Sequence, residues 1–295
     1  MARREALPLE RGLAMSEFSV LGRFTTSHLR TEPFPHIHIE NAVPEEIANQ
    51  LLEEYPPQEV LGLRRLQNNA RWSYSASKSL QNNAIPEIWR QFVSYHVSTS
   101  FWKELVEAFG ESLENSLLGA QPTIRDPRAA RVGTRGIEDD MAADVFMDAQ
   151  ISGNTPVTRR TSVRGTHVDA GDKLVSGLFY LRNPDDKTEG GNLEIQRWRS
   201  VVPRFLKPHL YYEGMRDVVR THCLIPYRHN SVILFINSLD ALHAVTPRAV
   251  TSFPRLFLNL AVETVDQRYA VPKVNLLGRG RRKLQSILLS DDIAK

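Results

Sequence analysis

Residues 165–181 read GTHVDAGDKLVSGLFYL, a stretch in which a pair of polar residues leads into an apolar run. His167 and Asp169 stand two positions apart, so in an extended chain both side chains point to the same face. The run Leu174–Leu181 is nearly all apolar, which is typical of a buried strand. We therefore expect two side chains of metal-ligand type beside a strand of the protein core.

A second histidine stands in a similar context further along the chain. His243 follows the apolar run SVILFIN at 231–237. Two imidazoles and one carboxylate on adjacent strands form the facial triad that binds Fe(II) and leaves coordination positions open for oxygen and a chelating co-substrate. Twelve residues beyond His243, Arg255 begins the run RLFLNLAV, and a buried arginine there can pair bidentately with a dicarboxylate.

The spacing of His167 and Asp169 carries little weight by itself. With nine His and 14 Asp in 295 residues, composition alone gives about 0.4 such pairs. The alternative interpretation is a hydrogen-bonded His–Asp pair and an unrelated histidine. The order of the apolar runs around His167, Asp169 and His243 favours the metal site.

The chain changes in character near residue 141. All 14 Asp lie after residue 120, and the earlier acids are all Glu, which favours helices, whereas Asp favours caps, turns and metal sites. Apolar periodicity predicts a strand at 36–40 and helices at about 44–55, 86–95 and 101–109. Later runs predict short strands at 143–151, 174–181, 192–196, 222–226, 231–236 and 255–262. The sequence therefore predicts an α+β protein whose β core is a sandwich or barrel.

The composition narrows the possible function classes. Lys and Arg number 37 against 34 Asp and Glu, and the formal charge of +3 is too small to indicate nucleic-acid binding. The single cysteine, Cys223, excludes an internal disulfide and a Cys-x-x-Cys metal cluster. No apolar stretch approaches the roughly 18–20 residues that span a bilayer, and charged residues interrupt the start of the chain where a signal peptide would stand. We expect a cytoplasmic protein with neither a membrane nor a nucleic-acid partner.

The order of these motifs resembles that of the Fe(II)/2-oxoglutarate-dependent dioxygenases, and most of all their prolyl-4-hydroxylase-like group. The matching motifs are H-x-D, LFYLRN, GGNLEI, VILFINSLDALHAVTP and FPRLFLNL, which together span roughly residues 144–263. The resemblance implies a double-stranded β-helix, a cupin-like jelly roll, with flanking N-terminal helices. It also implies that His167, Asp169 and His243 are the catalytic iron ligands and that Arg255 binds the distal carboxylate of 2-oxoglutarate. Phe257 departs from the family, many members of which have Ser or Thr at this position.

The resemblance implies an enzyme that uses Fe(II), 2-oxoglutarate and O2 and releases succinate and CO2. The expected reaction is hydroxylation of an aliphatic C–H bond in a small molecule, with anionic and natural-product-type molecules as candidates. Related halogenases have a small residue in place of the carboxylate, so Asp169 favours hydroxylation over halogenation. Desaturation, epimerisation and cyclisation use the same iron centre and stay open as alternatives. A jelly-roll protein that binds a metal without turnover also stays open.

Four further residues receive provisional roles. Arg248 is the alternative to Arg255 as the partner of 2-oxoglutarate. Tyr180 lies in the buried run that follows the H-x-D pair and is a second candidate for contacting the co-substrate. Arg131 and Arg164 are candidates for attracting an anionic substrate to the mouth of the site.

The chain is expected to form one oxygenase domain. Residues 1–140 would supply an N-terminal helical layer integral to that domain, with 121–140 as a lid-like loop rich in proline, glycine and charge. Residues 141–270 would form the β core, and residues 271–295 a basic tail that contains GRGRRK. The sequence makes no prediction of the oligomeric state.

Overall fold

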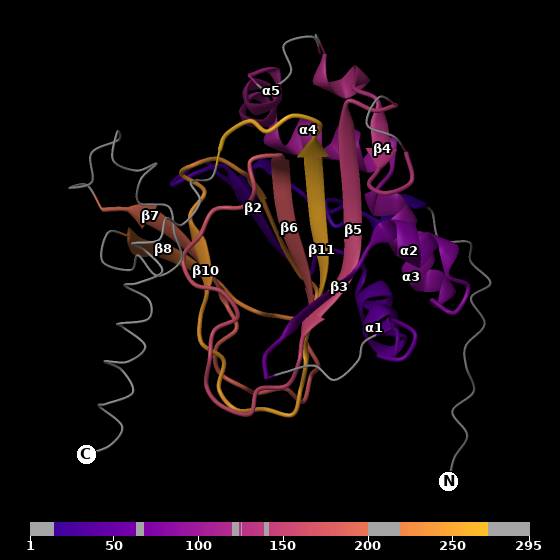
Figure 1. Ribbon diagram of the computed structural model, residues 1–295, viewed down its shortest axis with the longest axis vertical. Helices are drawn as coiled ribbons and strands as arrows, with labels where there is room; N and C mark the ends of the chain where they lie inside the picture. Colours follow the sequence, from indigo (N-terminus) through magenta and orange to yellow (C-terminus); the bar gives the residue numbers. More distant parts are fainter. Residues whose placement is uncertain are drawn as a thin grey trace.

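The computed structural model of the chain describes residues 15–62, 68–119, 124, 126–138, 142–199 and 219–270. These residues form a large β-sheet with helices along one side and a smaller β-sheet on the other side (Figure 1). The α+β class predicted from the sequence is thus confirmed. The predicted basic tail lies outside the described residues.

The large sheet has the strand order β1-β2-β9-β6-β11-β5-β3, and β4 pairs with β5 beside this path. Its strands are β1 Leu29–Arg30, β2 His36–Glu40, β3 Arg71–Tyr74, β4 Val132–Thr134, β5 Val145–Asn154, β6 Lys173–Leu181, β9 Ser231–Ile236 and β11 Arg255–Thr264. Neighbouring strands are antiparallel, apart from the parallel pair β4–β5. The central strand β11 is paired along its whole length with β5 and gives the sheet its longest ladder.

The small sheet has the order β10-β7-β8. Its strands are β7 Leu193–Trp198, β8 Val219–Ile225 and β10 His243–Val245. The segment that carries the H-x-D pair lies beside β10, because the amide of His167 donates to the carbonyl of His243 and the amide of His243 donates to the carbonyl of His167, each at 3.0 Å. This bridge adds the segment to the edge of the small sheet.

The helices pack against the outer face of the large sheet. They are α1 Glu45–Glu53, α2 Ala76–Gln81, α3 Glu87–His96, α4 Thr99–Phe109 and α5 Glu111–Leu118. The helices α1, α3 and α4 confirm the three predicted from apolar periodicity, and the short α2 and α5 were not predicted. Gly110 separates α4 from α5 with a φ of 52°, a backbone conformation that favours glycine. Among the described residues, no helix has both the length and the apolarity that crossing a bilayer requires.

The large sheet divides the interior into two cores because successive side chains on a strand point to opposite faces. On β11, Leu258 packs into the core between sheet and helices, which also contains Trp89 and Trp102. Its neighbour Phe257 packs into a second core between the two sheets, together with Ile195 of the small sheet. The inner face of β11 therefore faces the space between the two sheets, where the candidate site lies.

β3 and β4 are two of the short strands that the sequence does not predict. β3 joins the large sheet from within the predicted helical layer, and β4 lies inside the segment predicted as a lid-like loop. Strands of three or four residues are too short to show a clear period in the sequence. Gly133 fits the close packing of β4, because a Cβ there would lie 2.9 Å from the Cβ of Ala143. The loop prediction is wrong for Val132–Thr134, which pair with β5.

Truncating a leucine on the outer face of β11 tests this two-core arrangement. Leu258→Ala should lower the free energy of unfolding by roughly 2–5 kcal/mol, because Leu258 is fully buried and its loss leaves a cavity. Leu224→Ala is the matched control: its side chain on β8 is 51% exposed, and the change should stay within about 0.5 kcal/mol. Urea unfolding measures both, and equal losses would contradict the placement of β11 between two cores.

Candidate metal centre

Three side chains of metal-ligand type converge between the two sheets. They are His167 and Asp169 from the bridged segment and His243 from β10, and one ligand atom from each lies within 4.8 Å of the others. The Oδ1 atom of Asp169 is 3.7 Å from Nε2 of His167 and 3.9 Å from Nε2 of His243. Among the described residues, this is the one group of at least three His, Cys, Asp or Glu side chains with such a geometry.

Backbone carbonyls fix the tautomers of both histidines. Nδ1 of His167 lies 2.8 Å from the carbonyl oxygen of Gly165, and Nδ1 of His243 lies 3.0 Å from that of Ala241. Because a carbonyl only accepts, each Nδ1 carries the proton and donates it. The two Nε2 atoms therefore keep their lone pairs, which point toward Oδ1 of Asp169 and are available to a metal.

The carboxylate of Asp169 is oriented by two further side chains. Its Oδ2 accepts a hydrogen bond of 2.6 Å from the hydroxyl of Ser176 on β6. The Ser176 hydroxyl accepts in turn from Nδ2 of Asn237, which follows β9, at 2.8 Å. This chain occupies Oδ2 and leaves Oδ1 facing the two imidazoles.

Burial and charge set the protonation states that a metal needs. Burial lowers the pKa of His167 well below its ordinary value, with His243 and Arg164 acting in the same direction. Burial also lowers the pKa of His243. Burial by itself would raise the pKa of Asp169, but His243, Lys173 and His167 outweigh it and hold the pKa low. At neutral pH the site therefore presents two neutral imidazoles and one carboxylate, which match the facial triad of non-haem Fe(II).

The triad lines a cavity that also contains a buried arginine. The cavity has a volume of about 160 Å³, and Arg255 and Asn154 line it together with the triad. The hydroxyl of Tyr180 accepts from Arg255, and Tyr180 lies four residues beyond Ser176 on β6. Four residues of a strand span about 13 Å, so the triad and the guanidinium lie at separate places along the cavity. A wider hollow of about 620 Å³ over Arg182 is open to solvent and holds none of these groups.

Arg255 is held without a carboxylate partner among the described residues. It is 2% exposed, and its Nε donates to the carbonyl of Gly191 at 2.9 Å while Nη2 donates to the Tyr180 hydroxyl at 3.0 Å. Its guanidinium carbon lies 4.8–5.1 Å from the ring centres of Tyr180, Tyr227 and Phe257. A buried cation of this kind favours an anionic ligand, because an uncompensated charge in the interior is costly.

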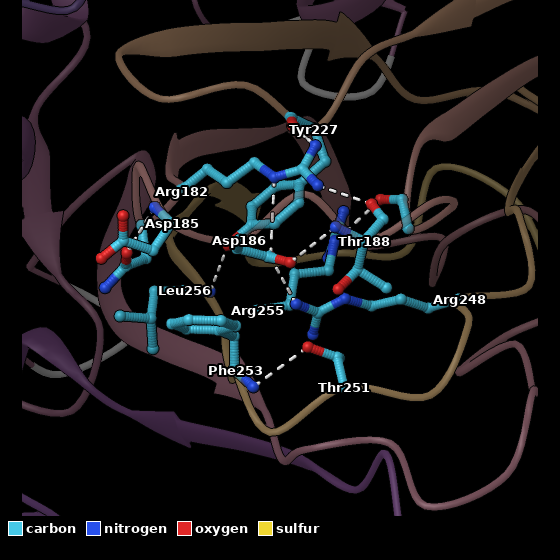
Figure 2. Close-up of polar contacts among 12 residues, drawn as sticks. Arg182, Asp185, Asp186, Thr188, Tyr227, Arg248, Thr251, Phe253, Arg255 and Leu256 are labelled. Carbon is cyan, nitrogen blue, oxygen red and sulfur yellow. Dashed lines mark hydrogen bonds and ion pairs between the residues drawn. The ribbon is translucent and has the colours of Figure 1, made fainter.

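Arg248 has a different environment. Its Nη2 donates to Oδ2 of Asp186 at 2.6 Å, both side chains are almost fully buried, and Nε of Arg182 lies 3.5 Å from the same oxygen (Figure 2). Arg248 does not line the cavity of the triad, whereas Arg255 does. Of the two predicted partners for a dicarboxylate, the structure thus brings Arg255 to the cavity and binds Arg248 into an internal ion pair. Tyr180 lies beside Arg255 and accepts its hydrogen bond, but it is not among the residues that line the cavity.

The two arginines predicted at the mouth of the site also differ in position: one lines the cavity and the other does not. Arg164 lines the cavity, and its Nη1 lies 3.7 Å from Oδ1 of Asp169. Arg131 does not line it: its Nη2 pairs with Oδ1 of Asp144 at 2.8 Å, next to the start of β5. The placement of Arg131 at the mouth was wrong because the chain before β5 is bound along that strand rather than folded over the cavity.

Sequence reasoning missed five polar residues of the cavity. They are Arg71 on β3, Asn154 at the end of β5, Lys173 and Ser176 on β6, and Asn259 on β11. The alternation of polar and aromatic residues in RWSY at 71–74 was the available signal for β3. Which cavity a four-residue strand would face could not be read from that alternation.

Removing the hydroxyl that orients Asp169 should weaken metal binding. In Ser176→Ala the carboxylate loses its hydrogen bond, and we expect the affinity for Mn(II) to fall roughly 10- to 100-fold. Ser152→Ala is the matched control, because the Ser152 hydroxyl is equally buried but donates to Ser73 and does not line the cavity. Calorimetric titration with Mn(II) measures both variants. Equal affinities in the two would contradict this role of Ser176.

The pH dependence of metal binding tests the lowered histidine pKa values. Each imidazole binds a metal only when neutral, and burial places the pKa of His167 and His243 below the ordinary 6.5. Asp169 is ionised throughout this range, because its pKa is lowered as well. We expect the Kd for Mn(II) to rise by clearly less than threefold from about pH 7.5 to about 6.5 and to rise further at more acidic pH. Two histidines of ordinary pKa would weaken binding roughly threefold over that interval, and such a result would contradict the prediction.

Neither a protein-family model nor a curated protein matches the sequence. Solved structures match the chain at low identity. A prolyl-4-hydroxylase from Pseudomonas putida is 14% identical, with 78% of this chain and 92% of that chain covered, at a TM-score of 0.43. The collagen prolyl hydroxylase of Paramecium bursaria Chlorella virus-1, solved with 2-oxoglutarate, is 12% identical, with 78% and 96% covered, at a TM-score of 0.41.

A third matching structure is an oxidoreductase of the 2OG-Fe(II) oxygenase family from Burkholderia pseudomallei. It is 12% identical, with 88% of this chain and 96% of that chain covered, at a TM-score of 0.38. At identities of 12–14% and TM-scores of 0.38–0.43, these likenesses carry no argument about the activity of the chain.

Proposed function

We propose that this protein is an Fe(II)- and 2-oxoglutarate-dependent oxygenase. One observation carries the proposal: a His–Asp–His triad and a buried arginine without a carboxylate partner among the described residues line the same cavity. The triad provides ligands for Fe(II), and the arginine provides a counter-charge for a carboxylate held at the far end of a chelating acid. A metal-binding protein without a dicarboxylate co-substrate has no need of the buried arginine.

The strand pairing supports a double-stranded β-helix as the fold. Along the chain, strands alternate between the large and the small sheet: β5, the bridged His167 segment, β6, the pair β7–β8, β9, β10 and β11. In space, β9-β6-β11-β5 face β8-β7-β10 and the His167 segment. This order is the one expected of a jelly roll, and it supports that fold. The N-terminal strands β1, β2 and β3 lie in the same large sheet, which supports one oxygenase domain.

Fe(II) bound by His167, Asp169 and His243 would couple the oxidative decarboxylation of 2-oxoglutarate, giving succinate and CO2, to oxidation of a substrate C–H bond. Residues of the protein would bind and orient the co-substrate and the substrate. Arg255, held in place by the Tyr180 hydroxyl, would bind the distal carboxylate and so orient the keto acid toward the triad. The apolar side chains that line the cavity would exclude water and hold the aliphatic part of a small-molecule substrate; they are Val163, Leu178, Leu193, Phe235, Val245 and Phe257. Hydroxylation is the proposed outcome.

Succinate formation tests the proposed activity. With Fe(II), ascorbate, O2 and 2-oxoglutarate, and with pools of small molecules present, the protein should release succinate, and His167→Ala should reduce it to background because a metal ligand is lost. A mass gain of one oxygen in a pool member would identify hydroxylation. A protein that binds the metal but forms no succinate above the His167→Ala control would instead be a metal-binding jelly roll without turnover.

Substituting Arg255 and Arg248 one at a time distinguishes the arginine that binds the co-substrate from the one that stabilises the fold. Arg255→Gln should weaken 2-oxoglutarate binding roughly 10- to 100-fold, because charge-assisted hydrogen bonds worth about 1.5–3 kcal/mol are lost. Arg248→Gln should leave that affinity unchanged but lower the free energy of unfolding by roughly 3–5 kcal/mol, because it removes the closest charge partner of the buried Asp186. Calorimetry on the Mn(II)-loaded protein and urea unfolding give the two values. The opposite pattern would assign 2-oxoglutarate to Arg248.

A further inference from the structure

The cavity of the triad carries more positive charge than the proposed iron and co-substrate need. Four cationic side chains line it, Arg71, Arg164, Lys173 and Arg255, against the single carboxylate of Asp169. Fe(II) and the dianion of 2-oxoglutarate neutralise each other, so loading both leaves the excess unchanged. Asp169 is assigned to the metal and Arg255 to 2-oxoglutarate. The other three cations, Arg71, Arg164 and Lys173, have no assigned ligand.

Lys173 has acidic neighbours outside the cavity. Its charge lowers the pKa of Asp148, against the stronger effect of burial, and its register partner on β11 is Glu263. Lys173 therefore has carboxylates close by.

In the described part of the chain, Arg71 has no carboxylate of this kind close to it outside the cavity. No hydrogen bond or ion pair joins its side chain to any described residue, and its guanidinium carbon lies 5.6 Å from the ring centre of Phe257. The residue as a whole is exposed, yet its guanidinium lies deep enough for burial to lower its pKa, an effect that Asp169 opposes and that Arg255 and Arg164 reinforce. Arg71 is thus a cation at the edge of the cavity, within electrostatic reach of both the triad and the other two arginines.

Arg164 approaches the cavity from the segment that leads to His167. Its side chain is 43% exposed, and Nη1 lies 3.7 Å from Oδ1 of Asp169, the oxygen that faces the two imidazoles. A metal bound at that oxygen would take over the negative charge of Asp169 and add positive charge beside Arg164. With its charge shared by the metal, Asp169 would be a weaker partner for Arg164 than it is in the metal-free site.

We propose that Arg71 and Arg164 together bind an anionic group of the substrate, a carboxylate or a phosphate, at the mouth of the cavity. The inference rests on the proposed function and names its substrate class: a small organic acid or phosphate ester whose aliphatic part enters between Leu178, Leu193 and Val245. Guanidinium groups suit this task because each presents two parallel donors to such an anion. Arg255 and Tyr180 serve the co-substrate, so Arg71 and Arg164 are left for the substrate.

Matched aromatic probes test the inference without knowledge of the substrate. The protein is loaded with Mn(II) and N-oxalylglycine, an inert analogue of 2-oxoglutarate, and titrated calorimetrically with benzoate, phenyl phosphate and the neutral benzamide. We expect at least one anion to bind ten times or more tightly than benzamide. The preferred anion distinguishes a carboxylate from a phosphate substrate. In Arg71→Gln/Arg164→Gln the preference should disappear, because no paired cations remain at the mouth.

Arg131→Gln is the matched control, since Arg131 is an exposed arginine that does not line the cavity, and it should keep the preference. Melting temperatures confirm that each variant is folded. A loaded wild-type protein with no preference for either anion, or a preference that survives in the double variant, overturns the inference. So does a loss of N-oxalylglycine binding in Arg71→Gln as large as in Arg255→Gln, because Arg71 would then serve the co-substrate. A wild-type protein that binds neither Mn(II) nor N-oxalylglycine contradicts the proposed function itself, and the inference with it.

Discussion

The reciprocal pair of backbone hydrogen bonds between His167 and His243 is the interaction on which the site depends. It joins two segments that are 76 positions apart in the sequence and places the two imidazole rings 4.0 Å apart. Because the bonds involve only main-chain atoms, both side chains are free to face the third ligand. The carbonyls of Gly165 and Ala241 then settle which nitrogen of each ring faces it. The metal geometry is therefore mainly a consequence of sheet pairing.

The large sheet supplies the second constraint. Its outer face must be apolar to hold the helices, so every functional side chain from β6 and β11 has to come from the alternate positions. Ser176 and Tyr180 on β6 and Arg255 on β11 satisfy this rule, and they lie along one inner face beside the small sheet. The spacing between metal ligand and cation is thereby fixed by the rise of a strand rather than by a flexible loop.

The sequence predicted the part of the site that follows from strong local patterns. The H-x-D pair, His243 after an apolar run and Arg255 at the head of another were identified because each adjoins a long strand. Arg71 was missed and Arg131 misplaced for one physical reason: β3 and β4 are too short for their alternation to be decisive, and their positions are decided by pairing with β5. The choice between Arg248 and Arg255 likewise required the position of Asp186, which no sequence spacing gives.

The enclosure of Arg255 by three aromatic rings has an entropic consequence. A free arginine loses up to about 2 kcal/mol of rotamer freedom when it is immobilised, a cost that weakens any ligand that has to order the side chain. Here Tyr180, Tyr227 and Phe257, with the carbonyl of Gly191, already hold the guanidinium in one place. Phe257, an aromatic ring at a position where many members of the family that the motifs resemble have Ser or Thr, thus contributes rigidity instead of a hydrogen bond. Folding has already met the ordering cost, and a carboxylate arriving at this guanidinium gains the full strength of its contacts.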